Sequence, residues 1–138
     1  MDTGTSTDPQ AAPRADSLIR FTLTSAFASA VGVAAAVLVD GLGLALAGLI
    51  AGRSPVLYHN EVVFTAAGSD LALGGGMVLS LLAGGFFLSL YPGSGRYDAA
   101  RLTMLWVVLH CFRQGFTQLA TVPLTEDSGV ARAFATLD

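Results

Sequence analysis

Long uncharged segments dominate the chain. The strongest cover residues 21–39, 71–91 and 102–124, and only the third contains a basic residue, Arg113. A helix of about 20 mostly apolar residues is long enough to cross a hydrocarbon core of about 30 Å. The pattern therefore predicts an all-α fold, an integral membrane bundle of three transmembrane helices.

The first segment is longer than one upright span. Asp40 follows residues 21–39, and residues 41–52 are again uncharged. A single helix over residues 18–52 would be about 52 Å long. It must tilt strongly or break near Asp40 and Gly41, and a break would give four membrane segments instead of three. We favour three, with residues 21–50, 71–91 and 102–124 embedded.

The remaining segments divide the chain into a domain and two tails. Residues 1–17 hold almost nothing that can be buried, which predicts a disordered N-terminal tail. The transmembrane helical domain then covers residues 18–124, and residues 125–138 form a C-terminal tail. Within the domain, residues 56–58 and 62–64 are short runs of strand formers, which predict a small extramembrane hairpin.

Arginine placement predicts the orientation. With three spans, Arg14, Arg20, Arg96 and Arg101 lie on the side of the N-terminus, whereas the other side holds two arginines. Basic residues concentrate in cytoplasmic loops. We therefore expect a multi-pass protein of the cell membrane with a cytoplasmic N-terminus.

Composition agrees with a membrane protein and narrows its partners. Charged residues make up 12% of the chain, and 53% of the residues are hydrophobic, whereas a soluble domain carries about a quarter charged residues. The net charge of −3 gives a nucleic acid no electrostatic footprint. The expected partners are the lipid bilayer and another membrane protein or a second copy of the chain. The lone cysteine, Cys111, excludes an internal disulfide and is expected to be a packing residue.

Polar side chains gather on one face of the third segment. At helical spacing they fall within an arc of about 100°. The members are Thr103, Trp106, His110, Arg113, Gln114, Thr117 and Thr121. Because unpaired polar groups are costly in hydrocarbon, this face is expected to point into the bundle.

Small residues mark faces for helix packing in the other two segments. In the first segment, Gly43 and Ala47 share a face with Asp40. In the second segment, small residues recur at every fourth position. They are Ala72, Gly76, Ser80 and Gly84. Such spacing lets membrane helices approach closely.

Two charges stand inside apolar segments, Asp40 and Arg113. Each alone costs about 2.5–3.5 kcal/mol on insertion scales, so we expect them to pair, with His110 or Gln114 completing their hydrogen bonds. With Thr117 these four residues form the predicted polar intramembrane cluster. It either holds the bundle together or carries protons or a solute.

The sequence shows no clear pattern of a metal site or of a catalytic nucleophile. The candidate ligands Asp40, His59, Glu61, His110 and Cys111 do not show the spacing of ordinary metal sites. We therefore predict no catalytic residue, no metal and no cofactor.

Residues 39–52, VDGLGLALAGLIAG, resemble the first catalytic helix of the site-2-protease-like intramembrane zinc metalloproteases. The resemblance implies that residues 56–64 are the strands that follow this helix and that residues 74–85 are the glycine-rich helix after them. Asp40, Gly41 and Leu44 stand where the family has the His, Glu and His of its His-Glu-x-x-His motif. The resemblance thus implies a degenerate, non-proteolytic relative, and it transfers no catalytic residue.

These observations predict a small polytopic membrane protein that acts as a non-catalytic subunit or scaffold through helix packing. Two alternatives remain open. One is a small transporter or proton pathway that uses Asp40, His110 and Arg113. The other is a membrane-embedded enzyme.

Overall fold

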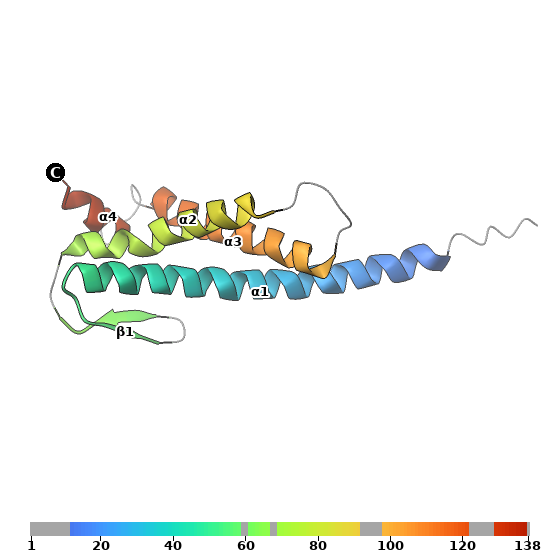
Figure 1. The fold of residues 1–138 in the computed structure, drawn as a ribbon, viewed down its shortest axis with the longest axis horizontal. Helices are drawn as coiled ribbons and strands as arrows, with labels where there is room; N and C mark the ends of the chain where they lie inside the picture. Colours follow the sequence, from blue (N-terminus) through green and yellow to red (C-terminus); the bar gives the residue numbers. More distant parts are fainter. Residues whose placement is uncertain (1–11, 59–60, 67–68, 92–97, 122–128, 138) are drawn as a thin grey trace, which may run out of the picture.

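The computed structural model describes residues 12–58, 61–66, 69–91, 98–121 and 129–137. Most of these residues are helical, and one helix is as long as the whole bundle (Figure 1). The elements in chain order are α1 (Ala12–Ile50), β1 (Pro55–Leu57), β2 (Val62–Phe64), η1 (Asp70–Gly74), α2 (Gly75–Ser89), α3 (Ala99–Thr121) and α4 (Gly129–Ala135).

α1 is a single helix of 39 residues, about 58 Å long at 1.5 Å per residue. The alternative of a break at Asp40 and Gly41 is wrong, because the helix continues through both. A glycine inside a helix costs about 1 kcal/mol, but the close approach of neighbouring elements to the glycines of α1 offsets that cost. α1 also begins earlier than expected, since residues 12–17 of the predicted tail are helical. Residues 1–11 of that tail lie outside the described part of the chain.

The pairing of the two predicted strands is confirmed, and the extramembrane position of the hairpin stays a prediction. β1 and β2 pair antiparallel, with Val56 opposite Val63 and Leu57 opposite Val62. The hairpin folds back along the C-terminal half of α1, and α1 lies between the hairpin and α2 (Figure 1). Its Phe64 ring packs on Gly48 of α1, where a Cβ atom would clash with the ring.

The three long helices lie side by side and alternate in direction. Gly43 of α1 meets Gly75 of α2, and the earlier residue Asp40 meets the later residue Gly76, so α1 and α2 are antiparallel. α3 runs parallel to α1. Together α2 and α3 cover one side of α1 (Figure 1).

The C-terminal tail expected at residues 125–138 is not a plain tail, because residues 129–135 form α4. α4 packs on η1 with Val130 and Ala133 buried, and the Cβ atom of Ala133 reaches Gly74. The apolar side chains at these two positions, three residues apart on one helix face, explain why this segment folds back.

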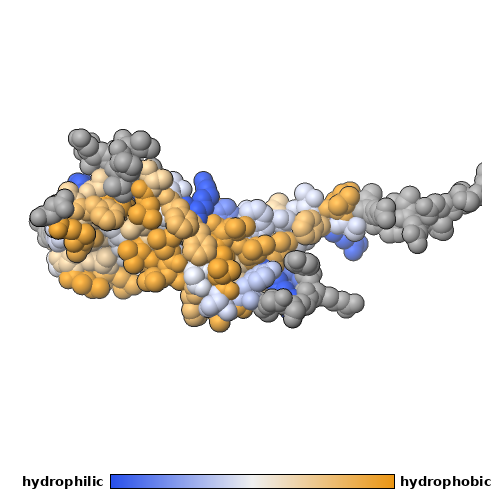
Figure 2. All heavy atoms as spheres, turned by 90° about the horizontal axis from the view of Figure 1, so that it is seen from above, coloured by the Kyte–Doolittle hydropathy of each residue, from blue (hydrophilic) through white to orange (hydrophobic). Residues whose placement is uncertain are grey.

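The interior is built from small residues, and the large apolar residues lie outside. Six of the nine buried apolar residues are small, namely Ala28, Ala36, Ala45, Ala72, Cys111 and Ala133, and the other three are Met77, Val108 and Val130. Many leucine, valine and phenylalanine side chains of α1 and α2 are exposed, among them Phe27 at 72% and Leu82 at 63%. Figure 2 shows the resulting apolar surface along the bundle.

Two helical stretches of the described chain are long and apolar enough to cross a membrane. They are Asp16–Ile50, which lies within α1, and Asp70–Ser89, which covers η1 and α2. Length and composition alone support this assignment. α3, the more polar helix, is not among them.

Candidate functional site

Asp40 lies where α1 meets both other long helices. The side-chain amide of Gln118 in α3 donates a hydrogen bond of 2.6 Å to its Oδ1 atom. On the α2 side, a Cβ atom at Gly76 would lie 2.5 Å from the same oxygen. Gly76 therefore gives the carboxylate room that a larger residue would remove.

Arg113 does not pair with Asp40, which corrects the expected ion pair. Arg113 is exposed on α3, and among the described residues the ion pair within 4 Å is that of Arg53 with Asp70. The expected completion of the pair by His110 or Gln114 also fails, since Gln118 makes the bond.

The residues of α3 that contact α1 follow a path that winds around α3. This path explains why Gln118, and not Arg113, reaches Asp40. α3 contacts α1 through Trp106, His110 and Gln118, positions that lie on one row of every fourth residue. Such a row winds about 40° around the helix at each step, because four residues exceed one turn of 3.6. By Gln118 the contact has rotated away from Arg113 and Thr117, and both are exposed.

Trp106 and His110 form a second polar contact near the other end of α3. The indole Nε1 of Trp106 donates to Ser25 Oγ at 3.1 Å, and Ser29 Oγ is hydrogen-bonded to His110 Nε2 at 3.1 Å. The two rings stack at 5.6 Å between centroids. Gly32 allows this approach, because a Cβ atom there would lie 2.8 Å from the backbone of Trp106.

Apolar packing separates the two polar contacts. Ser29 and Asp40 are eleven residues apart on α1, about 16 Å along its axis. Between them the buried residues of α1 are Gly32 and Ala36. The predicted cluster is thus divided: Asp40 and His110 belong to different layers, and Arg113 and Thr117 lie outside both.

Gln114 and Asp40 line the same cavity. The cavity, about 390 Å³, lies between α1, the hairpin and α3. Its polar lining comes from Asp40, Tyr58, Glu61 and Gln114, and its apolar lining comes from Val37, Leu38, Leu44, Leu57 and Val62.

The predicted packing residues lie in the helix interfaces. Gly43 and Ala47 of α1 both abut Gly75 of α2, and Gly84 of α2 meets the ring of Phe112 of α3. Ser80 is completely buried, and its hydroxyl has no hydrogen-bond partner among the described residues. Sequence reasoning missed Gly115 of α3, which receives Leu81 of α2.

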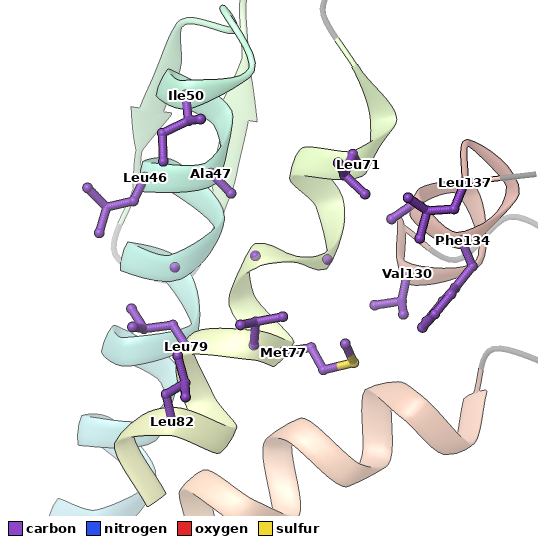
Figure 3. A pocket seen from close by; sticks show the side chains of 15 residues that line it. Leu46, Ala47, Ile50, Leu71, Met77, Leu79, Leu82, Val130, Phe134 and Leu137 are labelled. Carbon is purple, nitrogen blue, oxygen red and sulfur yellow. The ribbon is translucent and has the colours of Figure 1, made fainter. Parts of the chain in front are cut away.

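A second, larger hollow is almost entirely apolar. It measures about 480 Å³ and lies between α1, the η1–α2 segment and α4 (Figure 3). Leu46 and Ile50 line it from α1, Leu79 and Leu82 from α2, and Phe134 from α4. Its chemistry provides contacts for hydrocarbon and no group for catalysis.

Comparisons with protein-family models, with curated proteins and with solved structures find no match for this chain. Within the described residues, no three His, Cys, Asp or Glu side chains are grouped to hold a metal ion.

Proposed function

We propose that the protein is a non-catalytic subunit of a membrane assembly, a bundle of three transmembrane helices that works by packing with another membrane protein or with itself. One observation carries the proposal. Most buried residues of the described chain are alanine, glycine, serine or cysteine, with Met77, Val108 and Val130 as exceptions, whereas many leucine, valine and phenylalanine side chains are exposed. Lipid supplies no hydrophobic force between helices, so membrane bundles pack through small residues and turn large apolar side chains outward.

Helix direction supports α3 as the third span. α1, α2 and α3 alternate in direction, as three successive crossings of one bilayer must. The apolar surface would be exceptional in water, where exposed patches rarely exceed a few hundred Å². The arginine bias of the sequence favours a cytoplasmic N-terminus.

The separation of the charged residues favours the structural role over a proton or solute pathway. A pathway through Asp40, His110 and Arg113 needs these groups to exchange protons or share a solute. The two bonded layers lie about 16 Å apart along α1, and Arg113 is exposed. The hydrogen bonds at Asp40 and at His110 each join α1 to α3, which is what a structural role requires.

The order of elements agrees with a degenerate relation to the site-2-protease-like family. A long helix, two short strands and a glycine-rich helix follow each other here. The positions of the missing motif, Asp40, Gly41 and Leu44, supply neither imidazole to zinc nor a glutamate base to water. We propose such a relation as one of ancestry only, so the proposed role stays non-catalytic.

Cysteine labelling in sealed membrane vesicles tests the proposal. Cys111 is fully buried and is first replaced by alanine, after which single cysteines replace Thr5, Asn60, Ser94 or Thr136. Three spans place positions 60 and 136 on one side and positions 5 and 94 on the other. Labelling of 60 and 94 from the same side, or release of the protein from membranes by alkaline carbonate, would contradict the proposal.

A further inference from the structure

The cavity between α1, the hairpin and α3 carries two carboxylates, and none of the described residues that line it is basic. Asp40 of α1 and Glu61 of the hairpin supply the negative charges. Tyr58 adds a phenol and Gln114 of α3 adds an amide. All four side chains can accept hydrogen bonds, so the polar lining is suited to a positively charged donor.

The hairpin holds its polar residues close to Asp40. The backbone N–H of Tyr58 donates to the carbonyl of Glu61 at 2.8 Å, which extends the pairing of β1 and β2 by one step. At Gly41 of α1, a Cβ atom would lie 3.8 Å from Cγ2 of Val62, an ordinary van der Waals distance. Glu61 therefore lies beside the part of α1 that carries Asp40.

The carboxylate of Asp40 can accept a further donor. Its Oδ1 atom accepts the amide of Gln118, and within the described part of the chain no hydrogen bond reaches its Oδ2 atom. The amide is neutral and leaves the negative charge uncompensated. Asp40 lies inside Asp16–Ile50, a segment long and apolar enough to cross a membrane. A positive charge beside it would offset part of the cost of its burial.

The size and the walls of the cavity favour an organic cation over a metal ion. Its volume of about 390 Å³ falls within the range of small-molecule sites, about 300–1,000 Å³. Leucine and valine side chains of α1 and the hairpin form its apolar walls and suit a hydrocarbon chain. A metal ion needs several charged or carbonyl oxygens around one point, and no three acidic, histidine or cysteine side chains of the described residues are grouped in that way.

From this lining we propose that the cavity binds a primary ammonium group carried on a short hydrocarbon chain. The inference goes beyond the proposed function and rests on it for the membrane depth of Asp40. An ammonium has three donors, which match the carboxylates of Asp40 and Glu61 and the side-chain carbonyl of Gln114. A free alkylamine and the ethanolamine headgroup of a lipid share this chemistry.

Calorimetric titration of the full chain in phosphatidylcholine nanodiscs tests the inference, with empty nanodiscs as the reference. The probe is butylammonium. Butanol keeps the hydrocarbon chain without the charge, and butyrate reverses the charge. We expect butylammonium to bind at least about tenfold more tightly than butanol, because charged hydrogen bonds are about twice as strong as neutral ones, and we expect no binding of butyrate. Equal binding of butylammonium and butanol would overturn the inference.

Two variants locate the bound ammonium. Asp40→Asn keeps an acceptor for Gln118, and Glu61→Gln changes an exposed side chain, so both should fold. Each should weaken butylammonium binding at least about tenfold. Asp16→Asn removes an exposed carboxylate of α1 outside the cavity and should keep the original affinity. Unchanged binding in both cavity variants, or an equal loss in Asp16→Asn, would overturn the inference.

Two competing cations are tested directly. Arg113 precedes Gln114 and is exposed, and Arg113→Gln should leave the affinity for butylammonium unchanged. Binding that appears only in Arg113→Gln would show that the guanidinium occupies the acidic lining, and would overturn the inference. Displacement of butylammonium by a lower concentration of Mg²⁺ would also overturn it, in favour of a metal ion.

A change of lipid separates the two sources of the ammonium. Phosphatidylethanolamine in the nanodiscs should weaken butylammonium binding if the lipid headgroup is the ligand, and should leave it unchanged if the ligand is a free amine. Cysteine labelling that supports three spans, without a preference for butylammonium, would overturn only this inference. Labelling that contradicts three spans would overturn the proposed function whatever the titration shows.

Discussion

Gln118 donates its amide to the Asp40 carboxylate at 2.6 Å, and this bond takes the place of the ion pair expected with Arg113. Because the row of contacts on α3 winds around the helix, the residue that reaches Asp40 lies five positions after the arginine. The neutral amide joins the C-terminal third of α1 to the last turn of α3 and leaves Arg113 outside the bundle.

The bond predicts different costs for the two candidate partners. Gln118→Leu removes a donor from a partly buried carboxylate and should lower the free energy of unfolding by about 1–3 kcal/mol. Arg113→Met should change that free energy in the isolated chain by no more than about 0.5 kcal/mol, because the side chain is exposed. Denaturant unfolding in detergent, followed by circular dichroism, measures both. If Arg113→Met lowered the free energy of unfolding more than Gln118→Leu, the expected ion pair between Arg113 and Asp40 would be favoured after all.

Close approach of α1 and α2 predicts a contrast between two glycines of one helix. A Cβ atom at Gly76 would lie within 3.0 Å of three Asp40 atoms, whereas one at Gly85 would meet nothing within 4 Å. Gly76→Ala should therefore destabilise the bundle in spite of the better helix propensity of alanine. Gly85→Ala should be neutral or stabilising by up to about 1 kcal/mol. Equal thermal stability of the two variants in detergent would show that the helices do not touch at Gly76.

The predictable features of this fold rest on short-range pattern. Four-residue spacing identified Gly76 and Gly84 as interface positions, and short runs of strand-forming residues identified the hairpin strands. These signals depend on the spacing of residues within a single helix or strand, which can be read directly from the sequence. The same reasoning marked Asp40 and His110 as polar groups that the bundle must accommodate.

The missed features depend on how elements cross. Angles around an isolated helix placed Arg113 and Thr117 inward, because they assume that a neighbour follows one straight line along the helix. The actual contact drifts along a row of every fourth residue, so Gln118 faces α1. The sequence favoured one continuous first segment but left a break at Gly41 open, since continuity depends on what packs against the helix from outside.

We expect that removal of the Ser80 hydroxyl will not destabilise the protein. Its side chain is 0% exposed, and within the described part of the chain its Oγ atom has no hydrogen-bond partner. A buried polar group without a hydrogen bond carries a desolvation cost of about 1–3 kcal/mol. Ser80→Ala should therefore be neutral or stabilising. Ser29→Ala removes the bond to His110 and should cost about 1 kcal/mol. If Ser80→Ala destabilises as much as Ser29→Ala, the hydroxyl has a bound partner such as an internal water.

We expect the contacts of Arg53 to hold the hairpin against the bundle. Its Nη2 atom lies 2.5 Å from Asp70 Oδ1, its Nε donates to the Ser69 carbonyl at 3.1 Å, and its guanidinium lies 5.1 Å from the centroid of the Phe64 ring. These contacts join the start of η1 to the second strand. The side chain is only 13% exposed, so its charged hydrogen bonds are worth more than those of a surface pair.

Arg53→Ala should therefore release the hairpin while the three long helices stay together. We expect amide hydrogen exchange to speed up at least about tenfold in residues 55–57 and 62–64, because the loss of about 1.4 kcal/mol corresponds to a tenfold change in the opening equilibrium. Arg53→Lys keeps the charge but not the planar fork, and should restore only part of the protection. Arg132→Ala serves as the control, since it removes an exposed arginine from α4. Exchange in the hairpin that stays slow in Arg53→Ala would mean that the packing of Phe64 on Gly48 holds it without the arginine.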